Sequence, residues 1–261
     1  MSGSKRKKSN TKPVPASYRQ RTYRKSVNTG GLVSSLVTVR ETDLHILAAK
    51  PVDDQAYDAV YRYRNQLENY LARNPDFLTA LAPLPPDPLA PPIVRAMLAA
   101  ARAAQVGPMA AVAGAMAEYV GRDLLAAGNE EIMIENGGDI FLKRQKECLV
   151  AIFAGQSPLS QRVGIRIPAA QMPIGICTSS GAVGHSLSLG KADSVTVLAP
   201  STPLADAVAT RLGNEVGTKG DINRALQVAQ SIPDISGVVI ILDNQLGAWG
   251  AVDLVEIPGG P

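Results

Sequence analysis

Aromatic side chains and cysteines are scarce in this chain of 261 residues. Phe, Trp and Tyr make up only 4% of the residues, so the core must be built from Ala, Val, Leu and Ile. The two cysteines, Cys148 and Cys177, are too few for a disulfide framework and do not form a metal-binding motif. We therefore expect a protein without structural disulfides, in a reducing cytoplasm.

Long apolar runs are also missing. No run approaches the roughly 20 residues that a membrane-spanning helix needs. The basic segment Met1–Lys8 is followed by polar residues and not by the apolar stretch of a secretion signal. Hydrophobic residues make up 46% and charged residues 19% of the chain, which is typical of a globular protein. We expect no membrane association.

Acidic residues are absent from the first 25 positions, which carry nine Lys and Arg residues. Because the formal net charge of the whole chain is +3, subtracting these nine leaves the rest of the chain at −6. Residues 1–17 are rich in Ser, Lys and Pro and are predicted to be a disordered basic arm. Such an arm could bind nucleic acid, but it lacks aromatic residues for base stacking, so a solvated tail is favoured.

Residues 18–261 are predicted to form one domain, with a Pro-rich crossover at 75–92 that has no regular structure. Hydrophobic periodicity and turn residues predict helices at 53–73, 93–105, 109–127, 203–212 and 221–232. Strands are predicted at 32–39, 44–49, 131–135, 140–143, 148–154, 163–167, 174–177, 194–198, 238–242 and 247–255. Because most neighbouring strands are joined by short turns, we predict an α+β fold with a largely antiparallel sheet covered by helices.

The helix at 203–212 carries a pair of oxygen-bearing side chains. Asp206 and Thr210 are four residues apart and so lie on one helix face. A carboxylate and a hydroxyl suit a hard cation such as Mg²⁺, which prefers oxygen ligands. Alternatively, Asp206 complements the helix dipole and Thr210 hydrogen-bonds to the backbone. The pair alone leaves both interpretations open.

The helix at 109–127 has unusually small side chains over two turns. Five of them are Ala111, Ala113, Gly114, Ala115 and Ala117. Backbone this bare permits close approach by another backbone or by a ligand. Tight packing against a neighbouring helix is the alternative interpretation.

Two glycine-bearing turns are candidates for ligand binding. The first, Asn136-Gly137-Gly138-Asp139, predicts a β-hairpin, and its glycines expose N–H groups that can receive a phosphate or a ring system. The second, Thr178-Ser179-Ser180-Gly181, follows a strand, leads to His185, and could hold an anion through its hydroxyls. Cys177 just before it is more typical of a small buried residue than of a nucleophile.

The order of these motifs resembles the ApbE family of flavin transferases, which move FMN from FAD to a protein threonine with Mg²⁺. An Ala/Gly-rich helix is followed by Asn-Gly-Gly-Asp, by Thr-Ser-Ser-Gly with a later His, and by a helix that contains Asp-Ala-Val-Ala-Thr. The resemblance spans roughly residues 105–256. His185 is followed by Ser186–Asp193 where the family has an Ile-Asp-Pro-Arg-Thr-Gly-like run, which is typical of a side branch.

The resemblance implies an ApbE-like, T-fold-like domain and gives roles to particular residues. Asp206, Thr210 and a main-chain carbonyl near Ala113 would be ligands of Mg²⁺. The turns Asn136–Asp139 and Thr178–Gly181 would line the site of FAD or an FMN-like nucleotide. By elimination, and not by the resemblance, His185 is the nearest candidate for the catalytic base.

We therefore expect Mg²⁺-dependent binding of a flavin-type nucleotide, with transfer to a protein acceptor or hydrolysis at its pyrophosphate. The alternative is a non-catalytic protein that keeps the fold and a small-molecule pocket. The replaced run after His185 supports this alternative. A low-aromatic sheet with Ala-rich helices is also compatible with a homodimer.

Overall fold

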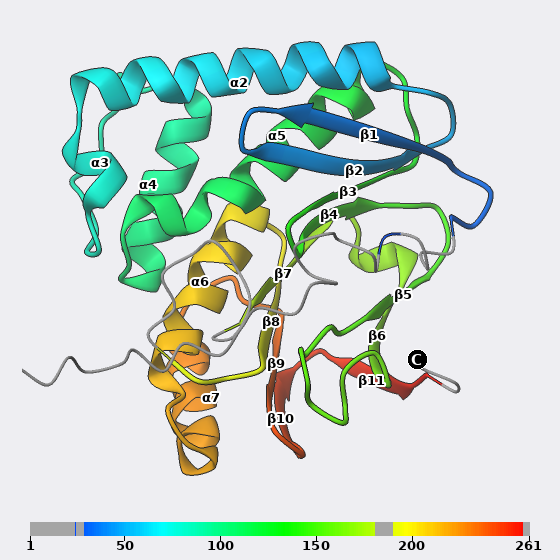
Figure 1. The fold of residues 1–261 in the computed structure, drawn as a ribbon, viewed down its shortest axis with the longest axis vertical. Coiled ribbons are helices and arrows are strands. Elements are labelled where there is room, and N and C mark those ends of the chain that lie inside the picture. The colour runs from blue at the N-terminus through cyan, green and yellow to red at the C-terminus, as the bar shows by residue number, and fades with distance from the viewer. Residues whose placement is uncertain (1–23, 25–28, 181–189, 258–261) are drawn as a thin grey trace, which may run out of the picture.

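The computed structural model describes residues 24, 29–180 and 190–257. Its largest element is an eight-stranded sheet in the order β1-β2-β3-β4-β7-β8-β9-β10 (Figure 1), and every neighbouring pair is antiparallel. The strands are β1 (Val33–Val39), β2 (Thr42–Ala48), β3 (Ile132–Asn136), β4 (Asp139–Lys143), β7 (Ile174–Ser179), β8 (Ser194–Ala199), β9 (Gly237–Leu242) and β10 (Gln245–Gly250). A second sheet consists of β11 (Asp253–Glu256), β6 (Val163–Ile167) and β5 (Cys148–Ala151), also antiparallel.

The helices cover one face of the large sheet, and the small sheet covers the other (Figure 1). The α-helices are α2 (Asp53–Arg73), α3 (Asp76–Thr79), α4 (Pro92–Ala104), α5 (Val112–Ala126), α6 (Thr202–Glu215) and α7 (Ile222–Gln230). The short 3₁₀ helices are η2 (Pro108–Ala111), η3 (Ala169–Gln171) and η4 (Lys219–Asp221). The predicted α+β fold with an antiparallel sheet covered by helices is confirmed.

The central strands are buried on both faces, because each contributes to two separate cores. In β9, Val238 and Ile240 pack in the core under the helices, whereas Val239 and Ile241 pack in the core under the small sheet. This alternation follows from the two-residue period of a strand. Both cores are mainly aliphatic, as the low aromatic content predicts.

Among the predicted elements that differ from the structure, three matter most for the fold. The strand predicted at 247–255 is wrong, because the chain leaves the large sheet at Gly250, where φ is +86°, and enters the small sheet as β11. The crossover predicted to be irregular contains the single-turn helix α3. The helix predicted at 109–127 begins as the 3₁₀ turn η2 and becomes an α-helix only at Val112.

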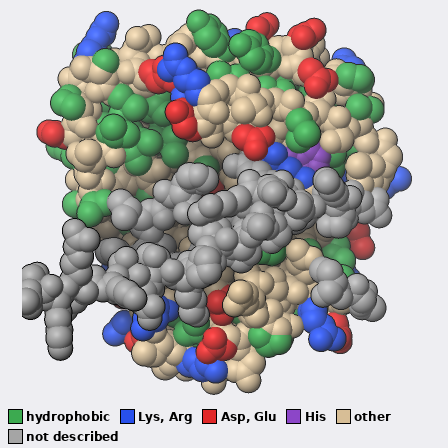
Figure 2. Space-filling model, in the orientation of Figure 1, with side chains coloured by type: hydrophobic (Ala, Val, Ile, Leu, Met, Phe, Trp, Pro, Cys, Tyr) green, Lys and Arg blue, Asp and Glu red, His purple; other side chains and the backbone are tan. Residues whose placement is uncertain are grey.

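The segment around α3 exposes several large apolar side chains. Leu78, Leu81 and Leu89 are each more than half exposed. Figure 2, drawn in the same orientation as Figure 1, shows hydrophobic side chains gathered on the surface where α3 and α4 lie.

Within the described residues, no single helix is both long and apolar enough to cross a membrane. The segments Pro92–Ala104 and Pro108–Ala126 meet these criteria only as a pair, and the chain bends by 107° between them. Both segments contribute side chains to the core under the helices.

Candidate functional site

The start of α5 and the middle of α6 meet at Gly114 and Asp206. The Gly114 N–H donates a hydrogen bond of 2.9 Å to Oδ2 of Asp206, although the residues are 92 positions apart. A Cβ atom at Gly114 would lie 2.6 Å from the carbonyl oxygen of Thr202 and 2.9 Å from Cβ of Asp206. The small residues of α5 thus let another helix approach, and they bring a carboxylate to the positive end of the α5 dipole.

The carbonyl of Ala113 lies beside this contact and is held from the hairpin of β3 and β4. Nδ2 of Asn136 donates a hydrogen bond of 3.1 Å to the Ala113 oxygen. The predicted ligands Asp206 and Ala113 and the predicted turn residue Asn136 therefore come together in space.

The turn between β3 and β4 is a two-residue hairpin, as predicted. Asn136 pairs with Asp139, and φ is +68° at Gly137 and +109° at Gly138. Two positive φ angles characterise the type I′ turn, whose twist matches that of paired strands. The turn lies beside the end of β7, since a Cβ at Gly138 would be 3.5 Å from the Thr178 oxygen.

Asp139, Asp206 and Cys177 form an acidic cluster under this turn, in which Asp139 and Cys177 are buried and Asp206 is half-buried. Burial raises the pKa of Asp139 well above its ordinary value, and the neighbouring charge of Asp206 raises it further. Burial also raises the pKa of Asp206 to about 7, although the amides of Gly114 and Ala113 favour its charged form. Burial, together with Asp139, keeps the pKa of Cys177 well above that of a free thiol, so the interpretation of Cys177 as a small buried residue fits the structure.

The donor atoms around Asp206 fit a hard divalent cation. Each candidate ligand offers an oxygen atom, as such a cation prefers: the carboxylate of Asp206, the hydroxyl of Thr210 one turn later and the carbonyl of Ala113. The side chains of Asp206 and Thr210 are partly exposed. Within the described ranges, no ion pair joins Asp139 or Asp206 to a Lys or Arg, and no cluster of three or more His, Cys, Asp or Glu side chains could hold a metal. A divalent ion would stabilise the charged forms of these two neighbouring carboxyl groups, which have no Lys or Arg ion-pair partner among the described residues.

The second predicted turn is described only in part. The hydroxyl of Thr178 shares a hydrogen bond of 2.9 Å with that of Thr196 in β8, so it is engaged within the sheet. Ser179 ends β7, and Ser180 is the last described residue before the gap. Gly181 and His185 lie outside the described residues.

The sequence did not single out Glu118, which positions α6. Glu118 is buried in α5, and its Oε2 accepts a hydrogen bond of 2.6 Å from the N–H of Thr202, the first residue of α6. Thr202 in turn packs on β7, where a Cβ at Gly175 would lie only 2.5 Å from its Cα. The available signal was an acidic residue within a helix whose other buried residues are Gly, Ala, Met, Val and Leu.

A protein-family model described as AbpE bacteria matches residues 24–245. The chain belongs to this family. Membership of the AbpE family confirms the predicted side branch of ApbE-like proteins. It also extends the similarity, which we expected over roughly 105–256, towards the N-terminus as far as Arg24.

Relatives of this AbpE family chain include proteins of Methanococcus and Methanocaldococcus species. The UPF0280 protein of Methanococcus aeolicus is 39% identical over 230 residues, which cover 85% of this chain and 91% of the relative. The UPF0280 protein of Methanocaldococcus jannaschii is 38% identical over 226 residues, with 83% and 90% covered. The apo form of the flavinyl transferase ApbE of Pseudomonas stutzeri has a similar fold, with a TM-score of 0.53 and 13% identity over 84% of this chain and 93% of that one.

Proposed function

We propose that this protein binds a flavin nucleotide with Mg²⁺ and cleaves it at the pyrophosphate, as a flavin transferase or a phosphohydrolase. The observation that carries the proposal is the convergence of Asp206, Ala113 and Asn136 at the junction of α5, α6 and the β3–β4 turn. The fold shared with a flavinyl transferase gives the flavin as the expected nucleotide.

Asp206, Thr210 and the Ala113 carbonyl are the residues that would hold Mg²⁺. When bound, the ion would supply positive charge to pyrophosphate oxygens that become more negative as a P–O bond breaks. Asn136 orients the Ala113 carbonyl through its side-chain amide. Burial and the neighbouring charge of Asp206 raise the pKa of Asp139, so Asp139 takes up a proton more readily than an ordinary carboxylate does, which limits repulsion between the two carboxyl groups.

The backbone of the β3–β4 turn would face the nucleotide. Gly137 and Gly138 have positive φ angles and no side chains, so a planar ring or a phosphate can approach the peptide groups closely. In the reaction, the P–O bond to the leaving AMP breaks, a P–O bond to the acceptor hydroxyl oxygen forms, and the proton of that hydroxyl passes to the solvent. The acceptor is a protein hydroxyl in transfer and water in hydrolysis.

Calorimetric titration of FAD, FMN and ADP, with and without Mg²⁺, followed by mass analysis of the mixture, tests this proposal. We expect Mg²⁺-dependent binding of FAD and release of AMP. Asp206→Asn should abolish the dependence on Mg²⁺, whereas Asp253→Asn, the same change at an exposed ion pair with Arg166 on the small sheet, should not.

Other results of this titration would argue against the proposed function or against one part of it. FAD binding without cleavage would favour the non-catalytic binding protein that the sequence also allows. An affinity that depends equally on Mg²⁺ in the wild type and in Asp206→Asn would contradict the metal assignment. Binding of none of the three nucleotides would overturn the proposed function.

A further inference from the structure

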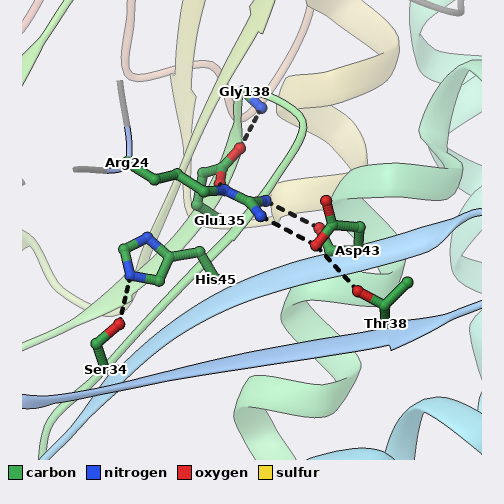
Figure 3. Close-up of polar contacts among 7 residues, drawn as sticks. All are labelled: Arg24, Ser34, Thr38, Asp43, His45, Glu135 and Gly138. Atoms are coloured by element: carbon green, nitrogen blue, oxygen red, sulfur yellow. Dashed lines mark hydrogen bonds and ion pairs between the residues drawn. The ribbon is translucent and has the colours of Figure 1, made fainter. Parts of the chain in front are cut away.

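A polar network lies on the face of the large sheet opposite the helices, around the side chain of Arg24 (Figure 3). The Arg24 Nε donates to Oε2 of Glu135 at 2.6 Å, and its Nη1 donates to Oδ1 of Asp43 at 3.0 Å. Its Nη2 also donates to the Asp43 carbonyl at 3.0 Å. Only 11% of the Arg24 side chain and 6% of the Glu135 side chain are exposed. Arg24 belongs to the basic N-terminal stretch, yet it is fixed on the folded domain.

The carboxylate of Glu135 joins Arg24 to the candidate nucleotide turn. While Oε2 accepts from Arg24, Oε1 accepts a hydrogen bond of 2.9 Å from the N–H of Gly138. Figure 3 shows Glu135 lying between the guanidinium and the glycine amide. Hydrogen bonds to ionised groups are shorter and stronger than neutral ones, so both contacts depend on the charge of Glu135.

The neighbouring histidine does not compete for this carboxylate. His45 on β2 shares a hydrogen bond of 2.8 Å between its Nε2 and the Ser34 hydroxyl. Burial lowers the pKa of His45, and the positive charge of Arg24 lowers it further. The imidazole is therefore neutral at neutral pH, whereas the Arg24 guanidinium is a cation in direct contact with Glu135.

We propose that Arg24 is a positioning residue that acts through Glu135 to hold the turn 136–139 in its ligand-binding conformation. This inference rests on the proposed function for the identity of the ligand. Without Arg24, the buried carboxylate of Glu135 loses the ion pair at Oε2 that helps to fix its orientation, so its Oε1 can move away from the Gly138 N–H. Gly138 then loses its charged acceptor, and the turn that also carries Asn136 becomes more mobile.

Hydrogen exchange of the full-length protein, measured by mass spectrometry, tests the first half of the inference. In Arg24→Gln, we expect amides at 136–140 to exchange about tenfold faster than in the wild type, as for the loss of one charge-assisted bond. Peptides from β9 serve as the internal control and should not change. Arg40→Gln is the matched variant, since it breaks an exposed Arg–Glu pair with Glu68 and should leave the turn unchanged.

FMN titration in the presence of Mg²⁺ tests the second half. Arg24→Gln and Glu135→Ala should each weaken binding about tenfold, and the double variant should be no weaker than Glu135→Ala, because Arg24 acts through Glu135. Arg24→Lys, which keeps the charge and loses the fork geometry, should restore part of the affinity and should fold if Arg24→Gln does not.

The outcomes separate this inference from the proposed function. Unchanged exchange at 136–140 in Arg24→Gln, or additive losses in the double variant, would overturn the role of Arg24. A wild type that binds no flavin nucleotide would overturn the proposed function and the ligand named here. Faster exchange in that same protein would still support the link from Arg24 to the turn.

Discussion

Gly114→Ala is the most direct perturbation of the contact between α5 and α6. The new methyl group would lie 2.6 Å from the Thr202 oxygen and 2.9 Å from Cβ of Asp206, so the helices must separate. Overpacking of this kind costs about 1–3 kcal/mol. Loss of the hydrogen bond from Gly114 to the carboxylate adds about 1.5–3 kcal/mol, whereas the better helix propensity of Ala returns about 1 kcal/mol. We expect a net loss of about 1.5–5 kcal/mol in the free energy of unfolding.

Urea unfolding followed by far-UV circular dichroism measures this loss. Gly217→Ala is a matched control, because the Gly217 N–H also donates to a carboxylate, Oδ2 of Asp221, at 3.2 Å. A Cβ at Gly217 would be 3.6 Å from its nearest neighbour, an ordinary contact, so we expect a change within about 1 kcal/mol. A Gly114→Ala protein within about 0.5 kcal/mol of the wild type would refute the close-approach argument.

Three further predictions concern the same region. The pKa of Asp206 is raised from 3.8 to about 7, so the folded state binds the Asp206 proton more tightly than the unfolded chain does. The resulting contribution to the free energy of unfolding is complete below pH 3.8 and is lost as the pH rises through 7. Unfolding curves between pH 4 and 8 should show a loss of at most about 4 kcal/mol that Asp206→Asn removes. Glu118→Ala leaves the buried N–H of Thr202 unpaired and should cost about 2–3 kcal/mol in urea unfolding, and a cost below about 0.5 kcal/mol would contradict the capping role. Thr210→Val should weaken Mg²⁺-dependent FMN binding about tenfold in calorimetry with little change in stability, and unchanged affinity would remove Thr210 from the ligand set.

Local chemistry made much of the fold predictable. The helix at 53–73 has the bounds that its periodicity predicts, and the Asn-Gly-Gly-Asp turn forms the predicted hairpin because its glycines accept positive φ. The break at Gly250 was missed because an apolar run continues on both sides of it, so hydropathy alone showed one strand. A positive φ at a glycine leaves no mark in a hydrophobic pattern.

The site was less predictable, since its contacts are distant in sequence. The small residues of α5 showed that something approaches closely, but not that Asp206, 92 positions later, is what arrives. Arg24 was counted with a basic stretch, and its two carboxylate partners, Asp43 and Glu135, are 19 and 111 positions away. Composition shows a charge of this kind, and only the folded chain shows what neutralises it.

Gly175 has a consequence for the register of β7 in the sheet. The first four residues of β7, Ile174–Cys177, are all buried, so sliding this strand by one residue would exchange one buried apolar face for the other. Hydrophobic burial alone is therefore nearly indifferent to such a slip. The close contact with α6 does not permit such a slip. A Cβ at position 175 would lie 2.5 Å from Cα of Thr202, so neither Ile174 nor Ile176 could take the place of Gly175 under α6. Gly175 thus fixes the register of β7 relative to α6. A chain without a glycine at position 175 could keep its apolar cores and still misplace Asp206.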